Sequence, residues 1–416
     1  MHKLCLAGSI LTIWNNFRNK ERLKHTIVWK MDKVYAFLIV VICWSFSIQV
    51  SAQTFSYFGD TITVHVPSNW ISEIRTNTET TESIMSFPSD RDIEGVQSLG
   101  KEIRTILDQK DITGCFQLGF LRQFVSAALS DATIHSRLFL EWMILTELDY
   151  RCFLAYSGEE LYLFLRSDSP LRNHEYYEIE EGKRYFLIGS TSQIVPDNLR
   201  LRMNSKRDLV PFDFIPKGYP VVKNSIYALK TIRYHHLGRL DSLEILVNKT
   251  RREMMIDVPE MPYWEYVQMP IDVRTSEMIR QGLFPEGISV GDSIKALKKL
   301  LAVIRSGIPF EENDTVGYYM TADEALASER ADCEDRVAVL YQISSSIFPF
   351  ESILIEMEGH LSIAVGLHGD FPNPIVHHGK TFYIVDPSID DPDFEIGDFP
   401  SDTLEILKIM ALPTVE

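Results

Sequence analysis

The chain has 416 residues, 45% of them hydrophobic and 24% charged, a composition typical of a globular protein with roughly two or three domains. Its formal net charge of −17 at pH 7 argues against binding to nucleic acid. The same charge disfavours docking on an anionic membrane surface.

The N-terminal segment has the features of a secretion signal. An apolar run at 34–44 follows a lysine, and the small residues at 50–52 fit a cleavage site. Because Met31 stands where such a signal would begin, we interpret 1–30 as an upstream extension and 31–52 as a signal peptide. The apolar run is too short for a membrane span. We therefore expect an exported bacterial protein, periplasmic or extracellular, without stable membrane insertion after cleavage. The alternative is a genuine long leader or an uncleaved anchor.

The next region, 53–195, is predicted to be an N-terminal α+β domain. Its pattern indicates β structure over 53–71, an exposed polar loop over 72–95, and helices over 96–107 and 116–129. Residues 196–270 are rich in turn signals, and we interpret them as a β-rich connector.

A C-terminal catalytic domain is predicted over 271–416. Asp292 opens an amphipathic helix that ends near Gly307. The paired histidines at 235–236 and 377–378 lack further ligands at suitable spacing, so neither a metal nor a cofactor is expected.

Three cysteines follow the leader: Cys115, Cys152 and Cys333. An odd count in an exported protein leaves at least one free thiol. Cys115 and Cys152 either pair or are buried, and burial is favoured because a chain of this size needs no disulfide scaffold.

Cys333 occupies the first turn of a predicted helix. Asp332 is a good N-cap residue, and Asp335 completes a short capping box. The positive end of the helix dipole favours the thiolate form of a cysteine there.

Two predicted strands carry a histidine and an aspartate that suit this cysteine. His360 begins an alternating strand over 360–367, and Asp386 follows a strand over 381–385. If the two strands pair in antiparallel fashion, His360 meets Asp386. A thiol, a base and a carboxylate in this arrangement are typical of nucleophilic acyl transfer.

These motifs resemble the transglutaminase-like superfamily. The resemblance rests on the Cys333 helix start, on Gly359-His360 opening a strand and on residues 383–387, Tyr-Ile-Val-Asp-Pro, closing another. It covers the last third of the chain. It implies an α+β, papain-like fold with Cys333 as nucleophile, His360 as general base and Asp386 orienting the imidazole. In that family a residue from the segment before the cysteine helix helps to bind the oxyanion, and Tyr319 is the candidate here, with Tyr318 as the alternative.

A second copy of this unit is predicted upstream. Residues 132–144 align without gaps on 331–343, and a hairpin and strand follow in the same order, about 200 residues before their counterparts. The triad positions of this copy carry Ile134, Glu160 and Gly189, which cannot perform the chemistry. We interpret it as a degenerate transglutaminase-like unit, and the alternative is a chance recurrence of helix, hairpin and strand.

The favoured function is a cysteine amidase or peptidase that acts through a thioester on a peptide, protein or cell-wall fragment. Nothing resembles the calcium loops of animal transglutaminases, so water is favoured over an amine as the acceptor. Two alternatives stay open: an amine-accepting, crosslinking transglutaminase, and a non-catalytic module that binds a peptide or glycan. The module stays open because Ala331 replaces the family's usual glycine and the tryptophan that often follows the histidine is absent.

Overall fold

The computed structural model describes residues 50–87, 93–202, 208–288, 292–311, 319–348, 350–391, 393–401 and 404–413. The chain divides into two compact units, one of Met1–Ser51 with Pro67–Asn69 and one of Ala52–Val66 with Trp70–Glu416. The second unit holds the core and the candidate site. The upstream extension, and the signal peptide apart from the first residues of β1, lie outside the described residues.

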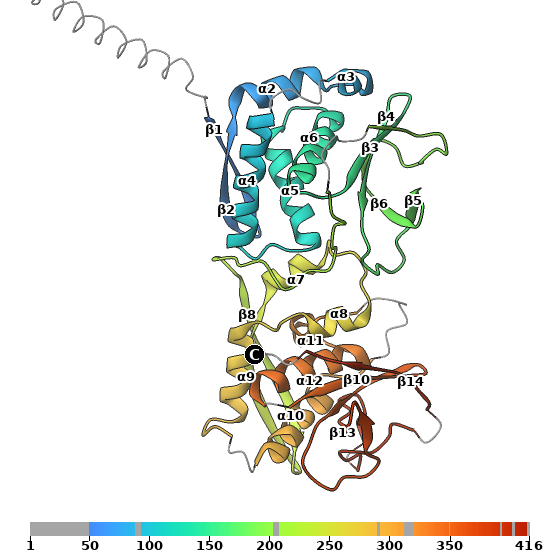
Figure 1. The fold of residues 1–416 in the computed structure, drawn as a ribbon. Coiled ribbons are helices and arrows are strands. Elements are labelled where there is room, and N and C mark those ends of the chain that lie inside the picture. Colours follow the sequence, from blue (N-terminus) through green and yellow to red (C-terminus); the bar gives the residue numbers. More distant parts are fainter. Residues whose placement is uncertain are drawn as a thin grey trace, which may run out of the picture. The chain divides into compact units, whose positions relative to one another are not determined.

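The N-terminal half begins with a hairpin, continues through helices and ends in a sheet (Figure 1). Its elements are β1 Val50–Tyr57, β2 Asp60–Pro67, α2 Ser68–Asn77, α3 Thr81–Ser86, α4 Ile93–Gln109, α5 Cys115–Ala128, α6 Ile134–Glu147, β3 Cys152–Ser157, β4 Glu160–Arg166, β5 Tyr176–Glu180, β6 Lys183–Ser190 and β7 Arg200–Arg202.

The C-terminal half repeats this order of hairpin, helices and sheet. Its elements are β8 Tyr227–His236, β9 Arg239–Asn248, α7 Lys249–Met255, α8 Tyr263–Gln268, α9 Val273–Leu283, α10 Ser293–Gly307, α11 Ala322–Ala327, α12 Cys333–Ile347, β10 Ser352–Met357, β11 His360–Val365, β12 Ile375–His377, β13 Lys380–Ile384 and β14 Ile406–Ala411.

Each half contains a five-stranded antiparallel sheet, and the two sheets have the same strand order. The order is β5-β6-β4-β3-β7 in the N-terminal half and β12-β13-β11-β10-β14 in the C-terminal half. The helix α6 contacts β3 and β4, as α12 contacts β11. The shared order predicted for the residues 132–191 and 331–388 is therefore found, and the fold is mixed α+β.

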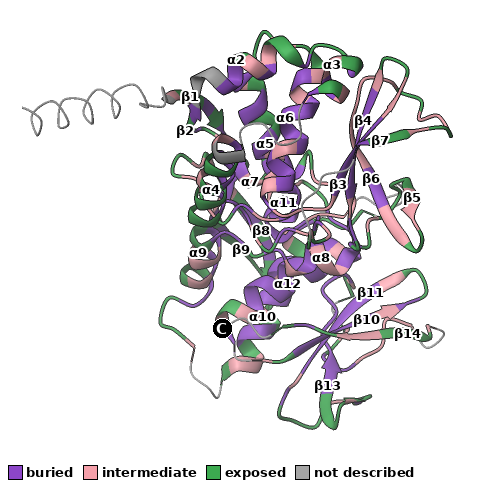
Figure 2. Ribbon diagram, turned by 45° about the horizontal axis from the view of Figure 1, so that its top comes forward, coloured by how far each residue is buried: buried purple, intermediate pink, exposed green. Residues whose placement is uncertain are grey.

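The central strands β10 and β11 of the C-terminal sheet are buried on both faces (Figure 2). Alternation along β11 directs Leu361, Ile363 and Val365 into one core with Val337 and Leu340 of α12. A second apolar cluster covers the opposite face. This packing fixes where the ends of α12 and β11 lie relative to each other.

The predicted loop over 72–95 is wrong, because α2 and α3 occupy much of it. Two large apolar side chains lie among its polar residues and are buried, Ile74 on α2 and Ile84 on α3. Trp70, four positions before Ile74 on the same helix, is buried as well. Thr80 forms a capping box with Ser83 that starts α3.

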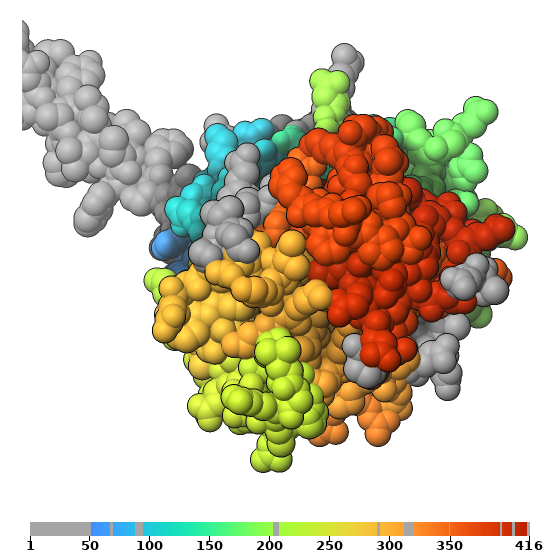
Figure 3. Space-filling view, turned by 90° about the horizontal axis from the view of Figure 1, so that it is seen from below, coloured from blue at the N-terminus to red at the C-terminus, as the bar shows by residue number. Residues whose placement is uncertain are grey.

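The hairpin β8–β9 packs against α9 and α10. Its residues Ile232 and Leu243 belong to the same core as α12. Gly307, at the end of α10, permits close approach, because a Cβ there would lie 2.4 Å from Ile232. Figure 3 shows one face on which the hairpin tip (yellow-green), the α9 segment (yellow-orange) and the C-terminal sheet (red) are all exposed.

Candidate active site

Cys333 is the first residue of α12, as predicted. Asp332 is the N-cap, and its side chain accepts a hydrogen bond from the Asp335 backbone N–H at 3.1 Å. Asp335 reciprocates by accepting from the Asp332 N–H at 3.2 Å. The capping box therefore fixes the backbone on both sides of the thiol.

The segments that lead to Cys333 are held by further hydrogen bonds. The Met320 backbone N–H donates to Asp335 Oδ1 at 2.7 Å, which ties the approach of α11 to the first turn of α12. Ala331 N–H donates to the Pro309 carbonyl at 3.0 Å. Cys333 is thus placed by backbone contacts from two earlier segments as well as by its own helix.

His360 and Asp386 meet as predicted. Strands β11 and β13 pair in antiparallel fashion, with Ala364 opposite Ile384. His360 Nε2 lies 2.7 Å from Asp386 Oδ2. Because Nε2 is engaged, Nδ1 is the ring nitrogen left to accept a proton, and it makes no hydrogen bond within the described part of the chain.

Asp386 is completely buried, and it is held as an acceptor on both carboxylate oxygens. Its Oδ1 accepts from the Ser388 N–H at 2.8 Å and from the Ser388 hydroxyl at 2.5 Å. Burial alone would raise the pKa of Asp386, but the hydrogen bond and charge of His360, together with Ser388, lower it below its ordinary value. The carboxylate is therefore ionised and oriented toward the imidazole.

Two arginines hold the chain around Asp386. Arg305 donates to the Asp386 carbonyl oxygen from Nε at 2.9 Å and from Nη2 at 2.6 Å. Arg336, fully buried on α12, donates to the carbonyl oxygens of Pro387 and Ser388, each at 3.2 Å. A guanidinium suits this task because it offers several donors in a fixed plane. Neither role was predicted. An arginine on the apolar face of the Cys333 helix does indicate a buried guanidinium that binds backbone carbonyl groups.

The thiol of Cys333 does not hydrogen-bond to His360 in this structure. Its Sγ instead donates to Glu334 Oε2 at 2.8 Å. Burial and the Glu334 carboxylate raise the pKa of Cys333, and a hydrogen bond from the Leu361 backbone N–H only partly opposes this rise. The expectation that the helix end would favour a thiolate is therefore wrong for this state of the site, since burial and a neighbouring anion outweigh the dipole.

The position of Leu361 still connects the thiol to the dyad. Because Leu361 directly follows His360, its contact with Cys333 places the start of β11 beside the first turn of α12. His360 keeps 14% of its side chain exposed, whereas Cys333 is 8% exposed. The three predicted residues are thus gathered at one end of the helix and sheet.

The first turn of α12 carries further acidic groups. Burial raises the pKa of both Asp332 and Asp335, and the charge of Glu334 raises that of Asp332 further.

Tyr319, the predicted oxyanion residue, lies next to Met320 and therefore near the first turn of α12. Its hydroxyl accepts a hydrogen bond from Arg172 Nη1 at 2.5 Å, and the guanidinium lies 5.5 Å from the ring centroid. Arg172 comes from the N-terminal half, 147 positions earlier. Burial raises the pKa of Tyr319, and the charge of Arg172 opposes the rise. Tyr318 lies outside the described residues.

The N-terminal half carries a comparable arrangement without the cysteine, histidine and aspartate. Ile134 begins α6 after the N-cap Thr133, as Cys333 begins α12. Glu160 begins β4, and its carboxylate accepts from the Thr191 hydroxyl at 2.5 Å. The residue that contacts Glu160 is thus Thr191, two positions after the predicted Gly189. A Cβ on Gly189 would lie 2.4 Å from Leu138 of α6, so packing explains that glycine.

The other two described cysteines are buried and unpaired, in agreement with the favoured alternative for Cys115 and Cys152. Over the described ranges, His, Cys, Asp and Glu side chains form no group of three suited to a metal ion. Among the helices in those same ranges, none combines the length and apolar character needed to cross a membrane.

Comparison of the chain with protein-family models, with curated proteins and with solved structures gave no match.

Proposed function

We propose that the protein is an exported cysteine hydrolase of transglutaminase-like type, cleaving amide or peptide bonds through a thioester. The observation that carries this proposal is the His360–Asp386 pair at 2.7 Å, beside a cysteine at the start of a buried helix. Such a pair supplies a base that is oriented by an anion and free on its other nitrogen.

The chemistry begins with transfer of the Cys333 thiol proton to His360 Nδ1. The sulfur attacks the carbonyl carbon of the substrate, and Tyr319 is the proposed side-chain donor to the resulting oxyanion. The intermediate then collapses, the C–N bond breaks, and the imidazolium returns its proton to the leaving amine. Water, deprotonated by His360, attacks the thioester and releases a carboxylic acid and the thiol.

The reaction requires the Cys333 thiol to break the hydrogen bond that it donates to Glu334 in this structure. A substrate that displaces the Glu334 side chain would free the thiol for His360. Such a step is compatible with an apo site whose catalytic hydrogen bonds form only in the complex.

A test uses the full chain and a library of short peptides and cell-wall fragments. Cys333→Ala and His360→Ala should each abolish turnover and leave the thermal unfolding midpoint nearly unchanged. Addition of a fluorescent primary amine distinguishes the acceptors, because hydrolysis leaves the amine free and transamidation incorporates it. Wild-type turnover in either alanine variant would eliminate the mechanism.

A binding module is the second candidate, and the contact between Cys333 and Glu334 favours it. A thiol that is neutral, buried and bound to a neighbouring carboxylate is a poor nucleophile. Site-selective labelling with iodoacetamide at mildly acidic pH separates the two functions: rapid labelling of Cys333 supports the enzyme, and sluggish labelling supports the module.

The matching strand orders of the two sheets support a duplicated unit whose first copy has lost its chemistry. We assign that copy a structural role beside the active site, through Arg172. Export is tested by mass spectrometry of the mature protein, in which an N-terminus at Gln53 is expected.

A further inference from the structure

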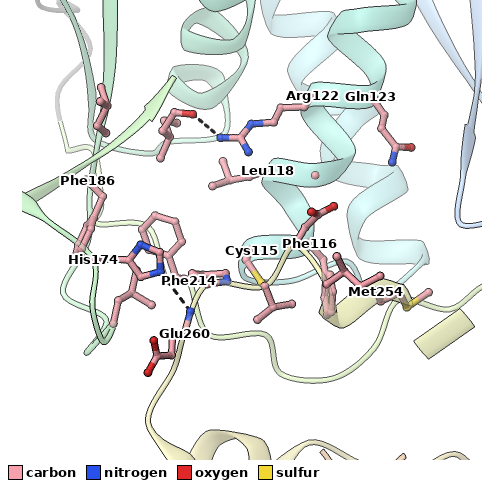
Figure 4. Close-up of a pocket in the computed structure, with 18 of the residues that line it drawn as sticks. Cys115, Phe116, Leu118, Arg122, Gln123, His174, Phe186, Phe214, Met254 and Glu260 are labelled. Atoms are coloured by element: carbon pink, nitrogen blue, oxygen red, sulfur yellow. Dashed lines mark hydrogen bonds between the residues drawn. The ribbon is translucent and has the colours of Figure 1, made fainter. Parts of the chain in front are cut away.

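A cavity whose lining includes none of Cys333, His360 and Asp386 is bounded mainly by the N-terminal half and, at 254–260, by the start of the C-terminal half. Its volume is about 680 Å³, and residues of β1, α5, β6 and the segments 171–175, 214 and 254–260 line it (Figure 4). That volume falls within the range of about 300–1,000 Å³ usual for small-molecule sites. The apolar part of the wall includes Phe58, Phe116, Leu118, Phe186, Phe214 and Met254.

A glycine in the middle of α5 opens onto this cavity. Gly119 is one of the lining residues, and a Cβ built on it would have no heavy atom within 4 Å. Glycine inside a helix costs about 1 kcal/mol relative to alanine. Close packing against another helix does not explain the glycine, because a Cβ at Gly119 would contact no neighbouring atom. We interpret Gly119 as a residue that leaves the cavity wall free of a side chain.

The charges around the cavity favour a cation. Glu175, Asp257 and Glu260 belong to its lining, and within the described part of the chain none of them forms an ion pair. The cationic side chain among the lining residues, Arg122, is already engaged (Figure 4). It donates to the Ile188 carbonyl at 2.5 Å, and its Nε lies 3.6 Å from the Glu141 carboxylate.

The His174 ring is engaged at the cavity edge, where its Nε2 accepts the Glu260 backbone N–H at 3.3 Å (Figure 4). The aromatic wall reinforces the preference for a cation, since ring faces attract ammonium groups. The net charge of −17 draws cations toward the molecule as a whole.

We propose that this cavity is a binding site for an organic cation with an aromatic or branched apolar body, of the size of an arylalkylamine. The apolar body would fill the space between α5 and β6, and the ammonium group would face the carboxylates of the rim. The site is independent of the proposed catalysis, because it uses none of the catalytic residues.

Three indole derivatives of similar size test the charge preference: tryptamine, tryptophol and indole-3-acetate, which are cationic, neutral and anionic. Isothermal titration of the full chain should show the tightest binding for tryptamine and the weakest for indole-3-acetate. Tighter binding of the anion, or no binding of tryptamine at millimolar concentration, would overturn the proposal.

Variants of α5 test the location. Gly119→Leu should abolish tryptamine binding by filling the cavity, whereas Ser126→Leu adds the same bulk at an exposed position of that helix and should leave binding intact. Unchanged binding by a folded Gly119→Leu variant would refute the site.

The double variant Glu175→Gln/Asp257→Asn gives a second test, on two exposed side chains. It should weaken tryptamine binding about threefold or more, the size expected for partly exposed charge pairs, and should leave tryptophol binding unchanged. Equal effects on the two ligands would refute the assigned role of the rim.

Discussion

At the first turn of α12, two acceptors are available for one proton. Glu334 Oε2 holds the Cys333 thiol at 2.8 Å, while His360 Nδ1 has no partner among the described residues. The competition is local, because Glu334 is the next residue in the chain. It determines how much thiolate is present before any substrate binds.

Glu334→Gln should therefore activate the thiol toward alkylation. The amide removes the anion that raises the pKa of Cys333, so more thiolate exists at any pH below that pKa. Each unit by which the pKa falls should increase the iodoacetamide rate about tenfold at fixed pH. Glu358→Gln, on the exposed turn before β11, is the matched control and should leave the rate unchanged. An unaltered rate in Glu334→Gln would show that burial alone controls the thiol.

Asp386→Asn should reduce kcat by at least about tenfold without abolishing turnover. The amide oxygen can still accept from Ser388, but it no longer stabilises a protonated His360. The effect should appear in kcat and hardly in KM, because Asp386 is completely buried and would act through His360. Steady-state kinetics on any substrate found for the wild type measures this. An unchanged kcat would mean that another group orients the imidazole.

How far the sequence predicted the site differs from residue to residue. The meeting of His360 and Asp386 was predictable, because period-two alternation and antiparallel pairing constrain strand ends. The partner of Cys333 was not, because the rotamer of Glu334 decides it. Arg172 was not predictable either, since sequence patterns do not report a contact between residues 147 positions apart.

At the scale of elements, the paired order of helix and strands was predictable from the repeat, whereas α2 and α3 were not. Polar residues dominate that segment, and burial of Trp70 and Ile74 becomes evident only once α4 and the hairpin are in place. The start of α3 did carry a local signal, namely the capping pair of Thr80 and Ser83.

The helix α6 carries a buried carboxyl group that should make stability depend on pH. Burial raises the pKa of Glu141 from 4.5 to about 7, although Arg122 opposes the shift. The folded state thus binds a proton more tightly than the unfolded state does. This contribution to stability is complete below pH 4.5 and is lost as pH rises toward 7.

Glu141→Gln should remove this dependence. The free energy of unfolding of the variant, relative to that of the wild type, should rise by about 3 kcal/mol between pH 4 and pH 8. The reason is that the wild type loses stability as the buried Glu141 ionises. Denaturant melts at both pH values measure the difference. Glu159→Gln, on the exposed turn between β3 and β4, is the control, and its free energy of unfolding should show the same pH dependence as that of the wild type. A constant difference for Glu141→Gln across this range would contradict the assigned pKa.

At the scale of the whole molecule, Arg172 links the N-terminal half to the proposed catalytic residues. It follows β4, and its guanidinium contacts both the hydroxyl and the ring of Tyr319. Since Arg172 donates to that hydroxyl, the Tyr319 O–H remains available as a donor. The positive charge also opposes the rise in the pKa of Tyr319 and makes the O–H a stronger donor. If Tyr319 binds the oxyanion, the two residues act as one unit.

A double-mutant cycle should reveal that unit. Arg172→Gln and Tyr319→Phe should each lower kcat about tenfold, the size of a hydrogen bond that involves a charged group. The double variant should lose little more than either single variant, because each change removes the same contribution. Arg200→Gln, on the exposed start of β7, removes an equal charge from the same half and should leave kcat unaltered. Additive losses would mean that Arg172 and Tyr319 affect kcat independently, which contradicts the proposed unit. Equal kcat in all variants would exclude Tyr319 from the oxyanion site while leaving the proposed roles of Cys333, His360 and Asp386 in place.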